Sequence, residues 1–181
     1  LNAVAHVWQW ADEDHAADLP PGARDALDAE PDVLRNAFWR DGTVRIAGRD
    51  LNGLDASPCT TKGGMTCMSC HQMHGADPND QLKPSATGDS PAGEQVCVDC
   101  HTDKATEDHT HHPTASTGAR CLNCHMPHTT IGLLTVMRAH RVDAPTATSS
   151  ADSGRPLACN LCHLDKSLAW SAEHMGEWYD Q

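Results

Sequence analysis

The chain has 181 residues, 39% of them hydrophobic and only 4% aromatic, with nine Cys and thirteen His. This length fits one domain or two very small ones, but so few aromatic side chains leave an ordinary hydrophobic core thin, and the many soft and borderline ligands indicate a metal or cofactor. The formal net charge of −12 argues against nucleic acid and anionic membrane surfaces as partners.

Residues 1–58 contain no Cys and are predicted to form an arm followed by one small β-hairpin. The hairpin signal is Asp41-Gly42, which alternating apolar residues follow. His15 is expected at the surface, and His6 is either a surface residue or a ligand that the arm carries to a distant site, including one in a neighbouring chain. No signal peptide and no membrane span of roughly 18 apolar residues is predicted, and the missing start Met favours a mature or truncated chain.

Residues 59–181 form the second predicted region, which we expect to pack with the first as one compact unit. Eight of the nine Cys there fall into four copies of the motif C-x-x-C-H, where chance gives about 0.03 per chain. The Cys pairs are Cys67 and Cys70, Cys97 and Cys100, Cys121 and Cys124, and Cys159 and Cys162, and the following residues are His71, His101, His125 and His163.

The spacing of the motif suits covalent attachment of haem. Two thiols three positions apart can each form a thioether with one vinyl group of a haem, and the adjacent His then reaches the iron as its proximal ligand. The motifs therefore predict four haem c groups. Zinc ribbons, iron–sulfur clusters and thioredoxin-like pairs do not require a His after every Cys pair. The leftover Cys59 is predicted to be a buried or half-buried free thiol, with a bridge to another chain or a role near the first haem as alternatives.

The remaining His supply more than enough distal ligands, on the opposite face of each iron. The preferred distal ligands are His74, His111, His112 and His140, and the further candidates are His109, His174, His128 and His6. Because three residues span at most about 10 Å, His74 cannot reach the far face of the haem held by His71, so it would serve a different haem, and the same holds for His128 after His125. His140 has enough chain behind it to wrap around a haem.

The predicted fold class is a mostly irregular, α-poor multihaem cytochrome, with short helices at the haem motifs and a core built of packed haems. Residues 77–95 and 142–157 are predicted to be surface loops. One C-terminal helix is expected from about Leu164 to Trp178, with Leu168, Ala172, Met175 and Tyr179 along one stripe.

The chain resembles the multihaem c-type cytochromes, and more narrowly the C-terminal haem-binding portion of a family of secreted bacterial multihaem cytochromes. The resemblance covers about residues 38–179 and rests on Asp41–Arg45, Asn52–Leu54, Ser57–Cys59, the first motif with His74, His109–His112, Cys124–Pro127, His140 and Ala158–Asp165. It implies electron transfer, a location outside the cytoplasm in the periplasm or at the cell surface, and distal ligands drawn from these His. A looser resemblance to tetrahaem subunits of extracellular cytochrome filaments implies a homopolymer in which a His of one subunit binds a haem of the next.

The predicted function is electron transfer by four closely packed, low-spin haems with two axial His each, and not catalysis. The alternatives are a filament subunit that binds further copies of itself and a multihaem reductase of a small oxyanion, which needs one iron with an open distal position. Adding about −1 for each oxidised haem takes the net charge from −12 to roughly −16, so redox partner proteins are expected to dock through a basic patch.

Overall fold

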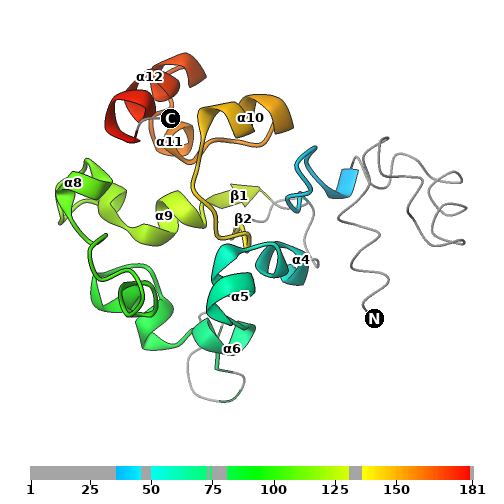
Figure 1. The fold of residues 1–181 in the computed structure, drawn as a ribbon, viewed down its shortest axis with the longest axis vertical. Coiled ribbons are helices and arrows are strands. Elements are labelled where there is room, and N and C mark those ends of the chain that lie inside the picture. The colour runs from blue at the N-terminus through cyan, green and yellow to red at the C-terminus, as the bar shows by residue number, and fades with distance from the viewer. Residues whose placement is uncertain (1–35, 46–49, 73, 75–80, 131–135, 180–181) are drawn as a thin grey trace, which may run out of the picture.

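The computed structural model describes residues 36–45, 50–72, 74, 81–130 and 136–179 (Figure 1). His6 and His15 therefore lie outside the described residues. Most elements are one or two turns long. They are α4 (Asp50–Asp55), α5 (Pro58–Gly63), α6 (Cys67–Cys70), η2 (Pro84–Ala86), η3 (Ala92–Glu94), α7 (Gln95–Val98), α8 (Glu107–Thr110), η4 (Thr117–Ala119), α9 (Cys121–His125), β1 (His128–Thr130), β2 (Val136–Arg138), α10 (Ala147–Ser153), α11 (Ala158–Cys162) and α12 (Leu168–Tyr179).

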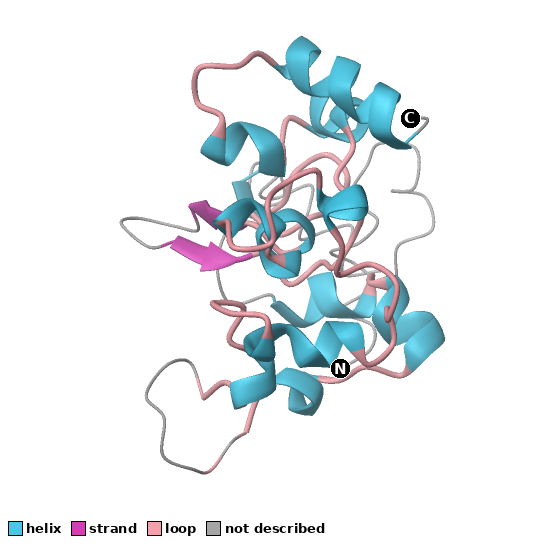
Figure 2. Ribbon diagram, turned by 90° about the vertical axis from the view of Figure 1, so that its left-hand side faces the viewer, coloured by secondary structure: helices cyan, strands magenta, loops and turns pink. Residues whose placement is uncertain are grey.

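The elements form two groups of helices with a small sheet between them. In Figure 1, α10, α11 and α12 lie together at one end and α4, α5 and α6 at the other, while α9 and the strands lie between. Strands β1 and β2 are antiparallel, with Thr129 opposite Met137. Figure 2 shows this sheet at one side of the molecule. Among the described residues, no helix has both the length and the apolar composition needed to cross a membrane.

The buried apolar residues among those described are few and mostly small. Large buried apolar side chains are Phe38, Leu54, Leu122, Leu157 and Met175, and the others are Ala. The two fully buried side chains, Ser57 and Ser171, are polar and make hydrogen bonds. Short helices thus pack without a continuous hydrophobic core of their own.

The chain reverses direction at Asp41-Gly42. Phe38 and Val44 form an isolated antiparallel bridge, and Trp39 N–H donates to the Thr43 carbonyl at 2.8 Å. Gly42 has a φ of 76°, which a residue without a Cβ adopts freely. This turn contacts the second half of the chain, because Arg155 Nε lies 3.0 Å from Asp41 Oδ2.

Residues 142–157 differ from the predicted surface loop, because they contain α10. The Thr146 side chain accepts a hydrogen bond from Ser149 N–H at its start, and Gly154, with a φ of 79°, ends it. The Thr- and Ser-rich composition of α10 is typical of a loop, and its caps offset that weak helix propensity. Residues 84–86 and 92–94 of the other predicted loop form short 3-10 helices.

The C-terminal helix begins at Leu168, later than predicted, because Leu164–Ser167 form a turn. Ser167 Oγ accepts from Trp170 N–H at 3.2 Å and so caps the helix. Its buried residues are Ser171 and Met175, whereas Ala172 and Tyr179 of the predicted stripe are exposed. The buried face of α12 differs from the predicted stripe, because Ser171 Oγ donates to Asn160 Oδ1 at 3.0 Å and so holds the Ser171 side of α12 against α11.

Candidate haem-binding site

Each C-x-x-C-H motif includes a turn of helix that brings its three functional residues together. In the first, second and fourth motifs, the backbone N–H of the His donates to the carbonyl of the first Cys, at 2.8–2.9 Å, which is the bond of one helical turn. The third motif lies wholly within α9. A residue and the one four positions later lie on the same face of a helix, so the first Cys and the His project from one side.

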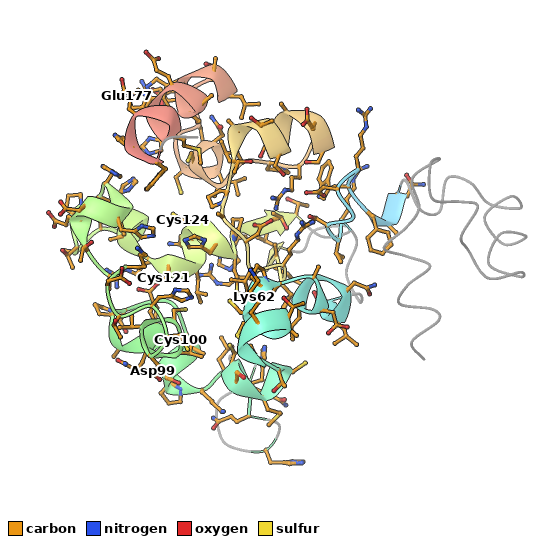
Figure 3. The ribbon with its side chains drawn as sticks, viewed as in Figure 1. Lys62, Asp99, Cys100, Cys121, Cys124 and Glu177 are labelled. Carbon is orange, nitrogen blue, oxygen red and sulfur yellow. The ribbon has the colours of Figure 1, made fainter. Side chains whose placement is uncertain are left out.

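Thiols of successive motifs lie close together. Cys97 makes a hydrogen bond to Cys121, which raises the pKa of the Cys97 thiol and lowers that of Cys121. Burial, reinforced by the nearby Cys159, raises the pKa of the Cys124 thiol to about 11. Figure 3 shows Cys100 below Cys121 and Cys124 on the neighbouring segment. The second attachment point therefore adjoins the third, and the third lies near the fourth.

Three of the four proximal His face a second imidazole at nearly the same spacing. The ring centroids of His71 and His140 are 6.3 Å apart, with 20° between their planes. Those of His109 and His125 are 6.2 Å apart and almost parallel, at 2°. Those of His112 and His163 are 6.0 Å apart, at 41°.

This spacing can be compared with what one metal ion requires. A metal–imidazole bond of about 2 Å on each side places the centroids of two axial rings about 6 Å apart. Three imidazole pairs with this separation, each next to two Cys, are a donor set that fits haem iron.

Comparison with known proteins supports the same chemistry. A family model, the doubled CXXCH motif, matches residues 58–106, which hold the first two motifs. The match supports a multihaem c-type cytochrome-like protein. Its motifs indicate covalent binding of haem c and electron transfer. No curated protein and no solved structure matches the chain.

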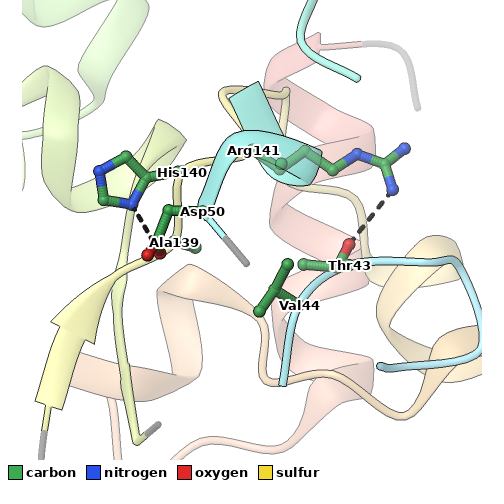
Figure 4. Close-up of a pocket in the computed structure, with 7 residues that line it drawn as sticks. Thr43, Val44, Asp50, Ala139, His140 and Arg141 are labelled. Carbon is green, nitrogen blue, oxygen red and sulfur yellow. Dashed lines mark hydrogen bonds and ion pairs between the residues drawn. The ribbon is translucent and has the colours of Figure 1, made fainter. Parts of the chain in front are cut away.

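Oxygen atoms lie near Nδ1 of three of the facing imidazoles, and two of the three contacts are hydrogen bonds. His140 Nδ1 lies 3.2 Å from Asp50 Oδ1, in the small pocket of Figure 4. His125 Nδ1 donates to the Asp143 carbonyl at 2.8 Å, and His112 Nδ1 to the Thr110 carbonyl at 2.6 Å. Such contacts fix the orientation of a metal-binding His and leave Nε2 for the metal. Burial lowers the pKa of His109, which favours the neutral ring that a metal needs.

The second motif differs from the other three. Residues 99–108, which include Cys100 and His101, are exposed throughout. Within the described part of the chain, no imidazole or aromatic ring contacts the ring of His101. The described residues therefore bring no second imidazole to the second motif.

The structure sorts the predicted distal His into two groups. His140, His112 and His109 each face a proximal His. The others do not. His111 stacks on Trp178 at 4.3 Å, His174 lies against Trp170 at 4.3 Å, His74 and His128 are exposed, and His6 is outside the described residues.

Cys59, the ninth Cys, lies half-buried on α5. Its charge, when ionised, would help to raise the pKa of the Cys70 thiol, although burial of Cys70 has the larger effect. The spare thiol is therefore close to the first haem motif.

Two arginines support the third motif, and sequence reasoning did not single them out. Arg138 donates to the carbonyls of Leu122 and Met126 and to Asn123 Oδ1, at 2.9–3.1 Å, and so binds the free carbonyls at the end of α9. Arg120 and Glu94 form an ion pair of 3.3 Å whose side chains are only 9% and 5% exposed. The residues next to each arginine do not indicate its role, because the groups that it contacts lie far from it in the sequence.

Proposed function

We propose that this chain is an electron carrier that holds four haem c groups, one on each C-x-x-C-H motif. The observation that carries the proposal is the common 6.0–6.3 Å spacing of three imidazole pairs. We assign His140 as the distal partner of His71, His109 as that of His125, and His112 as that of His163. Two His would bind each of these three irons, which would leave no position there for a substrate.

The bound haem supplies a reversible one-electron change at its iron. The chain's residues set the conditions for that change. The Cys hold each haem covalently, and the paired His keep its iron low-spin, with a potential below that of His/Met ligation. Asp50 and the carbonyls of Thr110 and Asp143 orient the imidazoles and raise their basicity, which further favours the oxidised state.

The acidic surface is expected to select basic redox partners, outside the cytoplasm. Attraction between a chain of net charge −12 and a basic patch speeds encounter and is screened by salt. The rate of electron exchange with a small basic cytochrome should therefore fall as ionic strength rises. A rate that does not change with salt would exclude this mode of docking. Haem staining of extracellular, periplasmic and cytoplasmic fractions tests the location.

Haem content and spin state test the assignment directly. A pyridine haemochrome assay should give about four haems per chain, and two or fewer would overturn the proposal. His140→Ala, His109→Ala and His112→Ala should each convert about one haem per chain to a high-spin form, as measured by electron paramagnetic resonance. The matched control is His128→Ala, on the exposed side of β1, which should leave the spectrum unchanged.

The second motif is where the alternatives separate. If a His of another copy binds this haem, the protein is a filament subunit, and size exclusion or electron microscopy at micromolar concentration will show polymers. If nothing binds there, the ferric protein has a high-spin haem, as a reductase of a small oxyanion needs. Purely low-spin spectra from a monomer would leave the soluble carrier, with His74 or His6 as the remaining ligand.

A further inference from the structure

One short segment faces two different haem motifs. The histidine loop, which we define as Glu107–Thr114, contains His109 and His112. His109 faces His125 of the third motif, and His112 faces His163 of the fourth. Any movement of this loop therefore changes the surroundings of two metal sites at once.

The backbone of the histidine loop explains how two neighbouring His diverge. Helix α8 is one turn long and ends at His111, whose φ is 52°. This left-handed conformation is uncommon for a residue with a Cβ and reverses the chain direction, so that His109 and His112 point to different motifs. Such a conformation persists only where the surroundings hold it.

The last turn of α12 provides those surroundings. The ring of Trp178 stacks on that of His111, with centroids 4.3 Å apart and 9° between the planes. Tyr179 Oη donates to the carbonyl of His109 at 2.5 Å, and its ring meets that of His111 edge-on at 5.4 Å. Both aromatic residues thus contact the loop, although neither faces a proximal His at the metal-pair spacing.

We propose that Trp178 and Tyr179 are positioning residues that hold the histidine loop so that His109 and His112 bind two haems together. The inference rests on the proposed bis-His haem sites. His111 faces no proximal His among the described residues. In this proposal, it is the residue through which α12 contacts the loop. We also expect that the third and fourth haems lose their distal ligands jointly, while the first haem, ligated by His140, keeps its own.

The test uses the full-length, haem-loaded protein and measures CO binding to the reduced form, which reports irons without a distal His. Trp178→Ala should add about two CO-binding haems per chain, and Trp178→Phe, which retains a ring to stack on His111, should bind close to the wild-type amount. Tyr179→Phe removes only the hydroxyl bond to the His109 carbonyl and should increase CO binding at both haems, by less than Trp178→Ala does. Trp39→Ala, which removes an indole from the Asp41-Gly42 turn, is the matched control and should behave as wild type.

The outcomes distinguish a failure of the positioning role from a failure of the proposed bis-His function. The positioning role would be overturned if Trp178→Ala bound no more CO than Trp39→Ala. It would also be overturned if Trp178→Phe bound as much CO as Trp178→Ala. If Trp178→Ala does not fold, Tyr179→Phe decides, and an unchanged CO binding in that variant overturns the inference. If wild-type protein contains no low-spin haem, the proposed bis-His function itself fails, whatever the variants do.

Discussion

Two regions of this molecule present distal imidazoles in contrasting ways. His140 lies in a segment that is fixed from several sides. Its Nδ1 lies beside Asp50, its carbonyl accepts a hydrogen bond from Ser57 Oγ at 3.4 Å, and the Val142 N–H donates to the same Ser57 Oγ at 2.8 Å. Helix α4 approaches so closely that a Cβ on Gly53 would lie 2.8 Å from the backbone N of Arg141.

The histidine loop, in contrast, is held by bonds at its two ends and by the aromatic contacts of Trp178 and Tyr179. Glu107 and His111 are exposed, and Glu107 Oε1 accepts from Thr114 N–H at 2.7 Å. Arg120 donates to the Thr114 carbonyl and is itself paired with Glu94. The difference teaches that a distal ligand can be fixed by a packed framework or by a loop with few contacts, and that the second kind should be easier to perturb.

The largest expected effect is at the buried ion pair of Arg120 and Glu94, which contacts the histidine loop through the Thr114 carbonyl. Arg120→Met should lower the free energy of unfolding by about 3–5 kcal/mol, because it leaves the Glu94 carboxylate buried and without its partner. Denaturant unfolding of the haem-loaded protein measures this. Lys104→Met, at an exposed position, is the control and should cost far less. Equal losses in the two variants would show that the ion pair does not hold the loop.

The next effect concerns the framework around His140. Gly53→Ala should destabilise the protein by about 1–3 kcal/mol, since the added methyl group meets the backbone of His140 and Arg141. Gly63→Ala is the matched control, because nothing lies within 4 Å of a Cβ placed there. Thermal unfolding compares the two. We expect only Gly53→Ala to make the first haem partly high-spin, and a wild-type melting temperature in that variant would contradict the close packing.

A smaller change should shift the reduction potential of one haem without unfolding the protein. Asp50→Ala removes the carboxylate beside His140 Nδ1, and if that weakens ligation of the oxidised iron about tenfold more than of the reduced iron, the potential rises by about 60 mV. Spectroelectrochemistry should show the potential of about one haem in four shifting upward. Asp55→Ala, on the exposed side of the same helix, should leave all potentials in place. A shift in both variants would indicate a general effect of surface charge.

The smallest expected effect is at the exposed end of the loop. Glu107→Ala removes the acceptor of the Thr114 backbone and side-chain bonds and should speed amide exchange in residues 107–114 about two- to fivefold. Asp108→Ala, at the neighbouring exposed position, is the control. We expect neither variant to change exchange near His140. Equal exchange in both variants would show that the Glu107 bonds do not restrain the loop.

The sequence identifies the local chemistry of this protein better than its long-range geometry. The C-x-x-C-H spacing predicts eight Cys and four His as haem-binding residues, because the proposed attachment and proximal ligation both need only one helical turn. The sequence also shows the His109–His112 cluster as a source of candidate distal ligands. Which of its members face a proximal His depends on the left-handed backbone of His111, and the sequence does not show which residue of the cluster adopts that conformation.

Contacts between distant segments could not be read from spacing. Asp50 meets His140, and Arg120 meets Glu94, only because short helices from different parts of the chain pack together. Helix α10 was not predicted from the sequence, for another reason. Its residues are weak helix formers, and two caps, at Thr146 and Gly154, define its ends.

The contact between Cys97 and Cys121 has a consequence for how the protein is assembled. These thiols belong to different motifs, yet they lie within hydrogen-bonding distance in the folded chain. In an oxidising compartment, two adjoining free thiols would form a disulfide and block thioether formation at both motifs. If both motifs carry haem, as proposed, these two cysteines must stay reduced until each has formed its thioether, because a disulfide between them would consume both thiols.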